Sequence, residues 1–195
     1  GLGLPDRDYY LNDAFKPQRD AYRAYIVRTM KMLGNPAPDK AADTILAFET
    51  EVAKASWAIA ERRDLGKINN PMSSAELTAY APGLDWNAWF AGAGIGPQKR
   101  MIVNENTAIR DIAALYGKTP LDTLKLWQEF HVADNAANYL SKDWVASRFE
   151  YTKALSGVSE LRPRWKRGLQ LVDGSLGELV GEHLERDRPI AGKKR

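Results

Sequence analysis

The feature that most constrains this chain is a run of apolar residues between Pro38 and Arg63, spaced for one face of an α-helix. Steps of three and four separate its members: Ala41, Ile45, Phe48, Val52, Ala55 and Ile59. Because an α-helix turns once in about 3.6 residues, such spacing lines a single side. Asp43, Glu51 and Lys54 fall off the stripe, which indicates one buried and one solvated face. The pattern predicts a long helix that starts at Pro38 and continues to about Arg63.

The residues after this stripe, Arg62, Arg63 and Asp64, allow two interpretations. Cations in a last turn interact favourably with the negative end of the helix dipole, so the three can be a solvated cap followed by a left-handed Gly66. Charge clusters at helix ends usually have this role. Alternatively, they form a structural motif that ties the helix by charged hydrogen bonds to the loop around Asn70.

Every other periodic segment also has helical spacing. Helices are expected at 17–33, 73–80, 85–90, 106–116, 119–139, 141–155 and from 159 onward. Ser73 and Glu76 have the spacing of a capping box, in which each side chain bonds the other residue's N–H. Only Met101 to Val103 looks extended, so at most one short strand or hairpin is predicted. The sequence therefore predicts an all-α protein of about seven helices, joined by long connections that carry Pro and Gly.

Length and charge limit the class of protein. A chain of 195 residues with 44% hydrophobic residues is an ordinary size for one domain with a sizeable core. We expect one helical domain over residues 1–185 and a basic, flexible tail over 186–195. The tail holds most of the positive charge, since the whole chain carries a net charge of only +3. The remaining body is close to neutral, which argues against a nucleic-acid binder.

Four basic residues surround Trp165 and give that segment some resemblance to a nucleic-acid site: Arg162, Arg164, Lys166 and Arg167. Basic residues at a helix start can also flank a buried tryptophan and need only solvent or acidic neighbours. The second interpretation is the better one. Trp165 is therefore assigned a structural role. No apolar run approaches the roughly 20 residues that span a bilayer, so no membrane segment is expected.

Catalytic chemistry finds little support in the sequence. There is no cysteine, which excludes disulfides and thiolate sites. A zincin needs H-E-x-x-H, and this chain has only two histidines, His131 and His183. The letters LVGEHLE around His183 are one substitution from H-x-x-E-H, but Leu179 takes the place of the first ligand. His131 lies beside an apolar stripe and is expected to be a packed, hydrogen-bonded residue. We assign no catalytic residue, metal ligand or cofactor to this chain.

Several stretches, in the same order and at similar spacing, resemble one known family. They are LGLPDRDYYL at 2–11, RRD at 62–64, NNPMS at 69–73, AELTAYAPGLDWNAWF at 75–90 and ALSGVSELRPRWKRGLQLVDGSLGELVG at 154–181. Together they resemble the N-terminal helical domain of the neprilysin and endothelin-converting-enzyme family of zinc metallopeptidases. Animal members carry a cysteine where this chain has Gly168, which indicates the bacterial oligopeptidase O type. Past Gly181 the sequence departs from the family pattern.

The resemblance implies that this domain is a lid that walls a substrate chamber and restricts substrates to small peptides. The zinc and the catalytic residues would belong to a C-terminal catalytic domain that is absent from this chain, so the chain alone is predicted to be inactive. Substrate-binding residues of the family's domain precede the position of Gly1, and none is transferred. A periplasmic or other extracytoplasmic location is implied. The alternative is a free-standing helical interaction module without catalytic activity.

Overall fold

The computed structural model describes residues 2–186, apart from the side chains of Val180 and of residues 182–186. The chain divides into two compact units, Gly1–Gly157 and Val158–Arg195. Within residues 2–186 there are eleven α-helices, two short 3-10 helices and one two-stranded hairpin. The predicted all-α class is confirmed, although more helices are present than expected. The prediction of one domain over 1–185 stays a prediction, and residues 187–195 of the expected tail lie outside the described residues.

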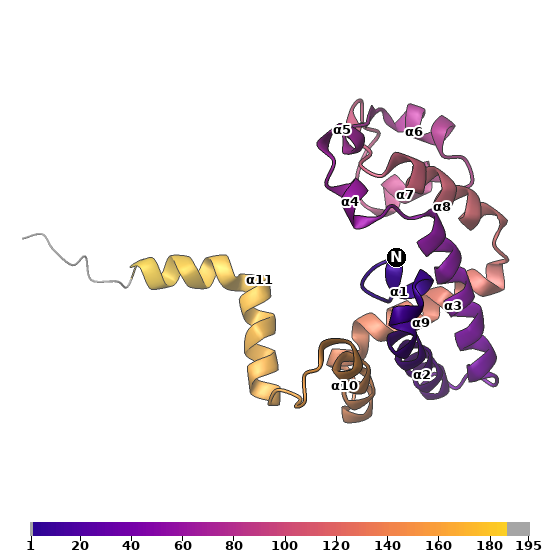
Figure 1. Cartoon of the computed structure of the whole chain (residues 1–195). Helices are drawn as coiled ribbons and strands as arrows, with labels where there is room; N and C mark the ends of the chain where they lie inside the picture. The colour runs from indigo at the N-terminus through magenta and orange to yellow at the C-terminus, as the bar shows by residue number, and fades with distance from the viewer. Residues whose placement is uncertain (1, 187–195) are drawn as a thin grey trace, which may run out of the picture. The chain divides into compact units, whose positions relative to one another are not determined.

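The first unit is built on two long helices, α2 (Lys16–Met32) and α3 (Pro38–Ala55), which pack against each other (Figure 1). The short α1 (Asp8–Leu11) and η1 (Asp13–Phe15) precede them, and α1 contacts both. Gly34, with a φ of 78°, makes the left-handed turn between the two long helices. Ile26 and Met30 of α2 and Ile45 of α3 are fully buried at their contact.

Three later elements complete this core: α9 (Leu121–Ala136), η2 (Ala137–Tyr139) and α10 (Lys142–Ser156). Helix α9 packs on α2 and α3, and α10 packs on α2. Gly157 ends α10 in a left-handed conformation, as helix-terminating glycines commonly do. We call the resulting cluster the main core. Its buried apolar members are Leu4, Tyr10, Tyr22, Tyr25, Ile26, Val27, Met30, Ala41, Ala42, Ile45, Ala53, Phe130 and Tyr151.

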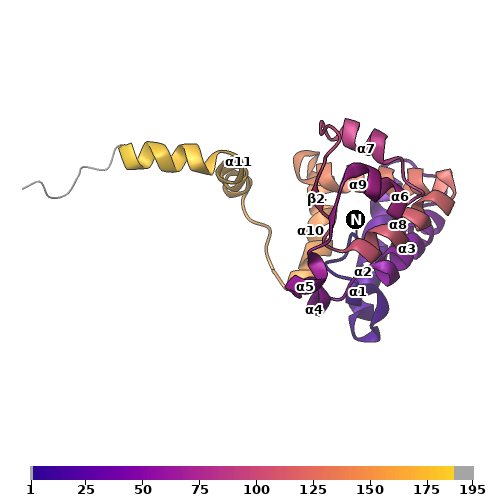
Figure 2. The ribbon, with the colours of Figure 1, turned by 90° about the horizontal axis from the view of Figure 1, so that it is seen from above.

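The segment between α3 and α9 forms a second, smaller cluster. Its elements are α4 (Ile59–Arg62), α5 (Leu65–Ile68), β1 (Pro71–Met72), α6 (Ser74–Tyr80), α7 (Trp86–Gly92), β2 (Met101–Ile102) and α8 (Asn106–Lys118). The strands are antiparallel and pair Pro71 with Ile102 and Met72 with Met101. Helix α8 lies beside α3 in both views (Figure 2). We call this the second cluster, with buried members Leu77, Ala81, Trp86, Phe90, Val103 and Ala113.

The capping box at Ser73 is confirmed: Ser73 N–H donates to Glu76 Oε2 at 2.7 Å, and Glu76 N–H donates to Ser73 Oγ at 3.2 Å. The predicted extent of the long helix to Arg63 is wrong, because α3 ends at Ala55 and Ser56 is extended with a ψ of 149°. The Trp57 indole N–H donates to Thr107 Oγ1 of α8 at 2.6 Å, so a tertiary contact draws the chain away from the helix axis.

Two smaller expectations at this junction are also corrected. Ile59, placed on the buried stripe by its spacing, lies in the separate helix α4 and is 46% exposed. Gly66 is not a left-handed helix exit, because it lies inside α5 and is absent from the glycines with positive φ in the described part of the chain. Tertiary packing has here overridden a local periodic pattern.

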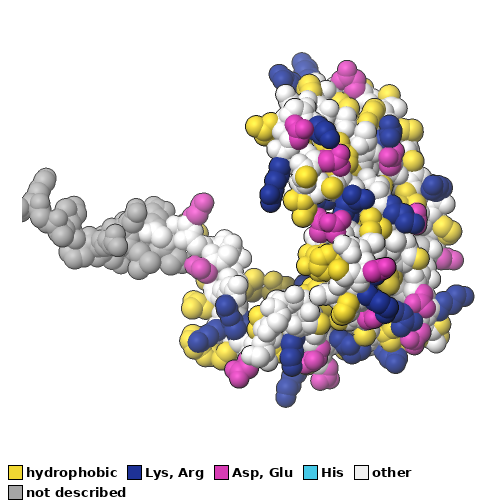
Figure 3. All heavy atoms as spheres, in the orientation of Figure 1, with side chains coloured by type: hydrophobic (Ala, Val, Ile, Leu, Met, Phe, Trp, Pro, Cys, Tyr) yellow, Lys and Arg dark blue, Asp and Glu magenta, His cyan; other side chains and the backbone are white. Residues whose placement is uncertain are grey.

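The second unit contains α11 (Arg164–Arg186). Its large apolar side chains lie at the surface along the described part of the helix (Figure 3): Trp165, Leu169, Leu171, Val172, Leu176 and Leu179. Trp165 was expected to be buried and is instead 66% exposed, with Lys166 Nζ lying 5.4 Å from its ring centroid. Among the described residues, no helix is both long and apolar enough to cross a membrane.

Candidate functional site

A carboxylate lies at the centre of the main core. Glu49 of α3 is one turn from Ile45 on the buried face of that helix and is 0% exposed. Its Oε2 accepts hydrogen bonds from the hydroxyls of Tyr10 at 2.6 Å and Tyr22 at 2.9 Å. Its Oε1 accepts from the Trp127 indole N–H at 3.1 Å and lies 2.6 Å from Nε2 of His131. Because an unpaired buried charge is very costly, these donors are what allow a carboxylate at this depth.

The same cluster perturbs the tyrosines around it. Burial raises the pKa of the Tyr10 hydroxyl well above its usual range, and the negative charge of Glu49 raises it further. The pKa of Tyr22 is raised by the same two causes in the same order. Burial also raises the pKa of Tyr151, with additional contributions from the charges of Asp134 and Glu49. These hydroxyls therefore stay protonated donors at neutral pH.

The cluster also fixes the N-terminal loop, residues 2–6, on the core. The Tyr10 hydroxyl accepts from the N–H groups of Gly3 at 3.0 Å and Leu4 at 2.9 Å. The Tyr151 hydroxyl of α10 donates to the Gly3 carbonyl at 3.0 Å. A Cβ at Gly3 would lie only 1.8 Å from the Tyr22 hydroxyl, so only glycine can approach so closely. The loop is thereby held at a defined position over the end of α3.

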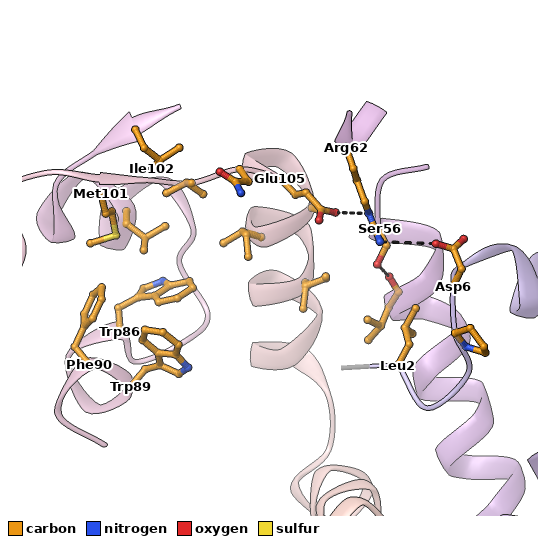
Figure 4. A pocket seen from close by; sticks show the side chains of 18 of the residues that line it. Leu2, Asp6, Ser56, Arg62, Trp86, Trp89, Phe90, Met101, Ile102 and Glu105 are labelled. Carbon is orange, nitrogen blue, oxygen red and sulfur yellow. Dashed lines mark hydrogen bonds and ion pairs between the residues drawn. The ribbon is translucent and has the colours of Figure 1, made fainter. Parts of the chain in front are cut away.

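The N-terminal loop forms one wall of a pocket of about 640 Å³. The other walls come from the end of α3 and from the second cluster, including its helices α4 and α8. Figure 4 shows Trp86, Trp89, Phe90 and Met101 grouped at one end. Most of the lining is apolar: Leu2, Leu4, Pro5, Val52, Leu77, Trp86, Trp89, Phe90, Met101, Ile102, Val103, Ala108, Ile109 and Ile112. A largely apolar pocket with a few convergent polar groups is typical of a ligand site.

The opposite end of the pocket is polar and acidic. Arg62 of α4 lies between two carboxylates, with Nε donating to Glu105 Oε2 at 3.2 Å and Nη1 lying 3.7 Å from Asp6 Oδ2 (Figure 4). The three side chains are 36%, 31% and 11% exposed, in the order Arg62, Glu105, Asp6. Two carboxylates thus share one guanidinium. The polar end carries an excess of one negative charge at neutral pH.

The predicted structural motif is only partly assembled. Arg62 makes charged contacts, but these reach Asp6 and Glu105 and not the loop around Asn70. Arg63 is exposed, and its side chain has no hydrogen bond or ion pair with any described residue. Asp64 caps α5 by accepting from Gly66 N–H at 2.9 Å and Lys67 N–H at 3.4 Å. The roles of Arg62 and Arg63 therefore differ, although the two residues are adjacent.

Asn70 holds its loop by other means than the predicted charges. Its side-chain amide donates to the carbonyl of Lys67 at 2.6 Å and to that of Asn104 at 3.4 Å, and its own carbonyl accepts from Val103 N–H at 2.9 Å. These bonds join the segment before β1 to the segment after β2. Trp165, which was also predicted to have a structural role, belongs to the second unit and is exposed.

Of the two histidines, only His131 has a side chain that the structure describes. His131 packs against the rings of Trp127 and Phe130 and bonds Glu49, which agrees with its expected role as a packed, hydrogen-bonded residue. The side chain of His183 lies outside the described residues. Among the residues whose side chains are described, no three His, Cys, Asp or Glu residues gather closely enough to hold a metal ion. The predicted absence of catalytic residues and metal ligands from this chain stays a prediction.

Sequence reasoning missed Glu49, Tyr10, Asp6 and Glu105. For Glu49 a signal was present, because a glutamate one turn after Ile45 lies on the apolar stripe and not on the solvated face. A charged residue at such a position is almost never fully buried unless it is paired. For Asp6 and Glu105 no local pattern existed, since their only common feature is Arg62, far from both in sequence.

The chain is similar to known proteins in both sequence and fold. The sequence model of peptidase family M13 matches residues 1–189. Endothelin-converting enzyme 1 of Rattus norvegicus is 27% identical over 190 residues, which covers 93% of this chain and 25% of that protein. The solved structure of Mycobacterium tuberculosis zinc metalloprotease Zmp1 in an open state matches with a TM-score of 0.92 and 31% identity, over 97% of this chain and 30% of that one.

The same mycobacterial protein in complex with an inhibitor also matches with a TM-score of 0.92, at 30% identity, over 96% of this chain and 30% of that one. The chain thus spans between 25% and 30% of the length of these relatives. The fold described above is shared with a segment of Zmp1 in both structures.

Proposed function

Because the chain belongs to peptidase family M13, whose N-terminal domain it represents, we propose that it is the helical lid of a neprilysin-like zinc metalloendopeptidase. In this role it walls the substrate chamber and restricts cleavage to small peptides. The observation that carries the proposal is the match over residues 1–189 together with the fold shared with Zmp1. The parent enzyme would act outside the cytoplasm, as the family resemblance implies.

The chemistry of the described side chains supports a wall and not a reaction centre. His131 is committed to Glu49 and packed between aromatic rings, so it does not fit a zinc-ligand set. We propose that zinc is bound by the catalytic domain outside this chain and there supplies an activated water. This chain would contribute a fixed surface. A core whose central carboxylate is saturated with donors suits that task, since such networks rigidify the elements that they join.

The exposed apolar side chains of α11 support the proposed partner. Trp165, Leu169 and Leu179 are each more than half exposed, and several large apolar side chains exposed on one helix often mark a protein contact. We propose that this helix packs against the remainder of the parent peptidase. The alternative, a free-standing interaction module, is favoured by the first unit, which has its own core.

The test combines this chain with a catalytic portion supplied separately. Zmp1 lacking the matching segment would be mixed with the purified chain, saturating zinc and short fluorogenic peptides. We expect no cleavage by the chain alone, and chelator-sensitive cleavage of short peptides but not of folded proteins by the mixture. Stoichiometric zinc with cleavage by the chain alone would overturn the proposal.

Two further measurements separate the lid from the free-standing module. A severed lid should bind a hydrophobic dye, and the variant Trp165→Ala should bind less of it. A monodisperse chain that binds no dye and does not complement the catalytic portion would instead support the free-standing module.

A further inference from the structure

The pocket between the N-terminal loop and the second cluster is assigned no role by the lid proposal. It lies wholly within the first unit, and its two ends differ in chemistry. Trp86 is 7% exposed and its indole N–H donates to the Ala81 carbonyl at 2.8 Å, so this ring is a fixed part of the wall. Trp89, by contrast, is 51% exposed and packs edge-to-face against Trp86 and Phe90. An anchored aromatic wall with one accessible ring can accept a large apolar group.

The acidic end selects a different kind of group. Asp6 and Glu105 share the single guanidinium of Arg62, and the charge left over is negative. Asp6 is only 11% exposed, so its charge is poorly screened by water. A ligand that brings a cation to this end would complete the charge pairing. A ligand with a carboxylate there would meet repulsion, and that difference gives specificity.

The edge of the hairpin indicates the class of molecule. The sheet has only the two strands β1 and β2, so β2 has one edge without a strand partner in the described structure. Met101 and Ile102 of β2 both line the pocket, and Ile102 is 47% exposed. An exposed strand edge beside side-chain pockets is a common way to bind an extended peptide.

We propose that this pocket is a peptide-binding site, in which a large apolar side chain packs against Trp89 and a cationic group of the same peptide lies beside Asp6 and Glu105. In Figure 4 the aromatic group and the two carboxylates lie at opposite ends of the lining, with α8 between them. The two groups of the peptide must therefore be separated along its chain. The ligand class is a short peptide that carries both an aromatic and a basic residue.

The inference does not depend on the lid proposal, because binding is measured on the purified full chain without any cleavage. The probes are fluorescently labelled, N-acetylated and C-amidated peptides that contain Phe and Arg separated by two alanines, in both orders. Matched peptides replace Arg by Glu, or Phe by Ala. Fluorescence anisotropy gives the dissociation constants. We expect saturable binding of a Phe and Arg peptide, weaker by about tenfold when either residue is replaced.

Two variants locate the site. Trp89→Ala should weaken binding of the Phe and Arg peptide by about tenfold or more, because it removes the accessible ring. Glu105→Gln keeps an acceptor for Arg62 but removes the charge, so it should weaken binding of the peptides that contain Arg and reduce the preference for Arg over Glu. The matched controls are Trp165→Ala and Glu51→Gln, at exposed positions outside the pocket, and both should bind as the unchanged chain does. Circular dichroism and melting temperature confirm that each variant is folded.

Several outcomes would overturn the proposal. They are the absence of saturable binding at millimolar peptide, equal affinity for Arg and Glu peptides, and unchanged binding by Trp89→Ala. Tighter binding of decanoate than of any peptide would make the pocket an acyl-chain site. Loss of peptide binding on addition of the Zmp1 catalytic portion would mean that the rest of a family member covers the pocket.

Discussion

The main core and the pocket each contain carboxylates, but these carboxylates differ in how deeply they are buried and how fully they are paired. In the main core, Glu49 is fully buried, and four side-chain groups from three other elements surround it. In the pocket, Asp6 and Glu105 share one arginine and remain partly accessible. A charge whose partners are all supplied by the fold stabilises one arrangement of helices. A charge that is left partly unpaired at an open surface is available to a ligand.

The first prediction tests the fully buried carboxylate of the main core, Glu49. Glu49→Ala should lower the free energy of unfolding by about 3 to 5 kcal/mol, because it leaves buried hydroxyl, indole and imidazole groups without their acceptor. Urea unfolding followed by circular dichroism measures the loss. Glu51→Ala, an exposed neighbour on the same helix, should change stability by no more than about 0.5 kcal/mol. Similar losses for the two variants would mean that the buried network does not stabilise the fold.

The second prediction concerns alkaline pH. The folded-state pKa values of four buried tyrosines, Tyr10, Tyr22, Tyr25 and Tyr151, are raised above the ordinary value of 10.0, chiefly by burial. Above pH 10 the unfolded chain therefore loses protons that the folded chain keeps, and stability falls as pH rises. Four such groups should remove roughly 5 kcal/mol for each pH unit in that range. Below pH 10 their contribution is fully present.

The measurement is thermal unfolding between pH 9 and 11, with tyrosinate absorbance recorded in parallel. The buried tyrosines should ionise only as the protein unfolds. Tyr10→Phe should make the fall with pH shallower by about a quarter, since one of the four groups is then absent. Ordinary ionisation of all tyrosines near pH 10, with the fold intact, would contradict this prediction.

The third prediction tests the charged end of the pocket, where Arg62 lies between two carboxylates. Arg62→Ala removes the cation that lies between Asp6 and Glu105, but Arg62 and Glu105 are each about one third exposed, so the loss of stability should be about 1 kcal/mol or less. The loss should shrink as salt is added. A loss as large as that of Glu49→Ala would erase the contrast between the two sites.

The smallest effect on stability is expected at Arg63, the residue that follows Arg62. Arg63→Ala should leave the free energy of unfolding within about 0.5 kcal/mol, because Arg63 is exposed and makes no ion pair with a described residue. Arg62→Ala and Arg63→Ala together form a matched pair on one turn of chain. Equal losses for the two would indicate that neither arginine has a specific partner in solution.

Local rules predicted the helices and their starts. Pro38 begins α3, the Ser73 and Glu76 capping box begins α6, and the stripe through Ala41, Ile45 and Val52 is buried. The same rules failed at Ile59 and Gly66, where Trp57 reaches α8 and turns the chain. Periodicity describes one helix at a time and contains no information about such long-range contacts.

Most of the candidate site could not be predicted from the sequence, for the same reason. Asp6, Arg62 and Glu105 come from three distant parts of the sequence and have no shared motif. Trp86, Trp89 and Phe90 were recognised as helical residues after Asp85, but their grouping around a pocket depends on the hairpin and α8. Trp165 shows the converse error, in which a correct helix assignment led to a wrong expectation of burial.

The hydrogen bond from Tyr151 to the Gly3 carbonyl also bears on the order in which the protein folds. It joins residues 148 positions apart, at the two ends of the first unit. Contacts between such distant residues form late, because closing a long loop costs entropy before the contact is made. During synthesis, Gly3 leaves the ribosome long before Tyr151 is made. The loop can bond Tyr10 early, but its bond to Tyr151 forms only after α10 has been made, so this anchor of the pocket wall is added late.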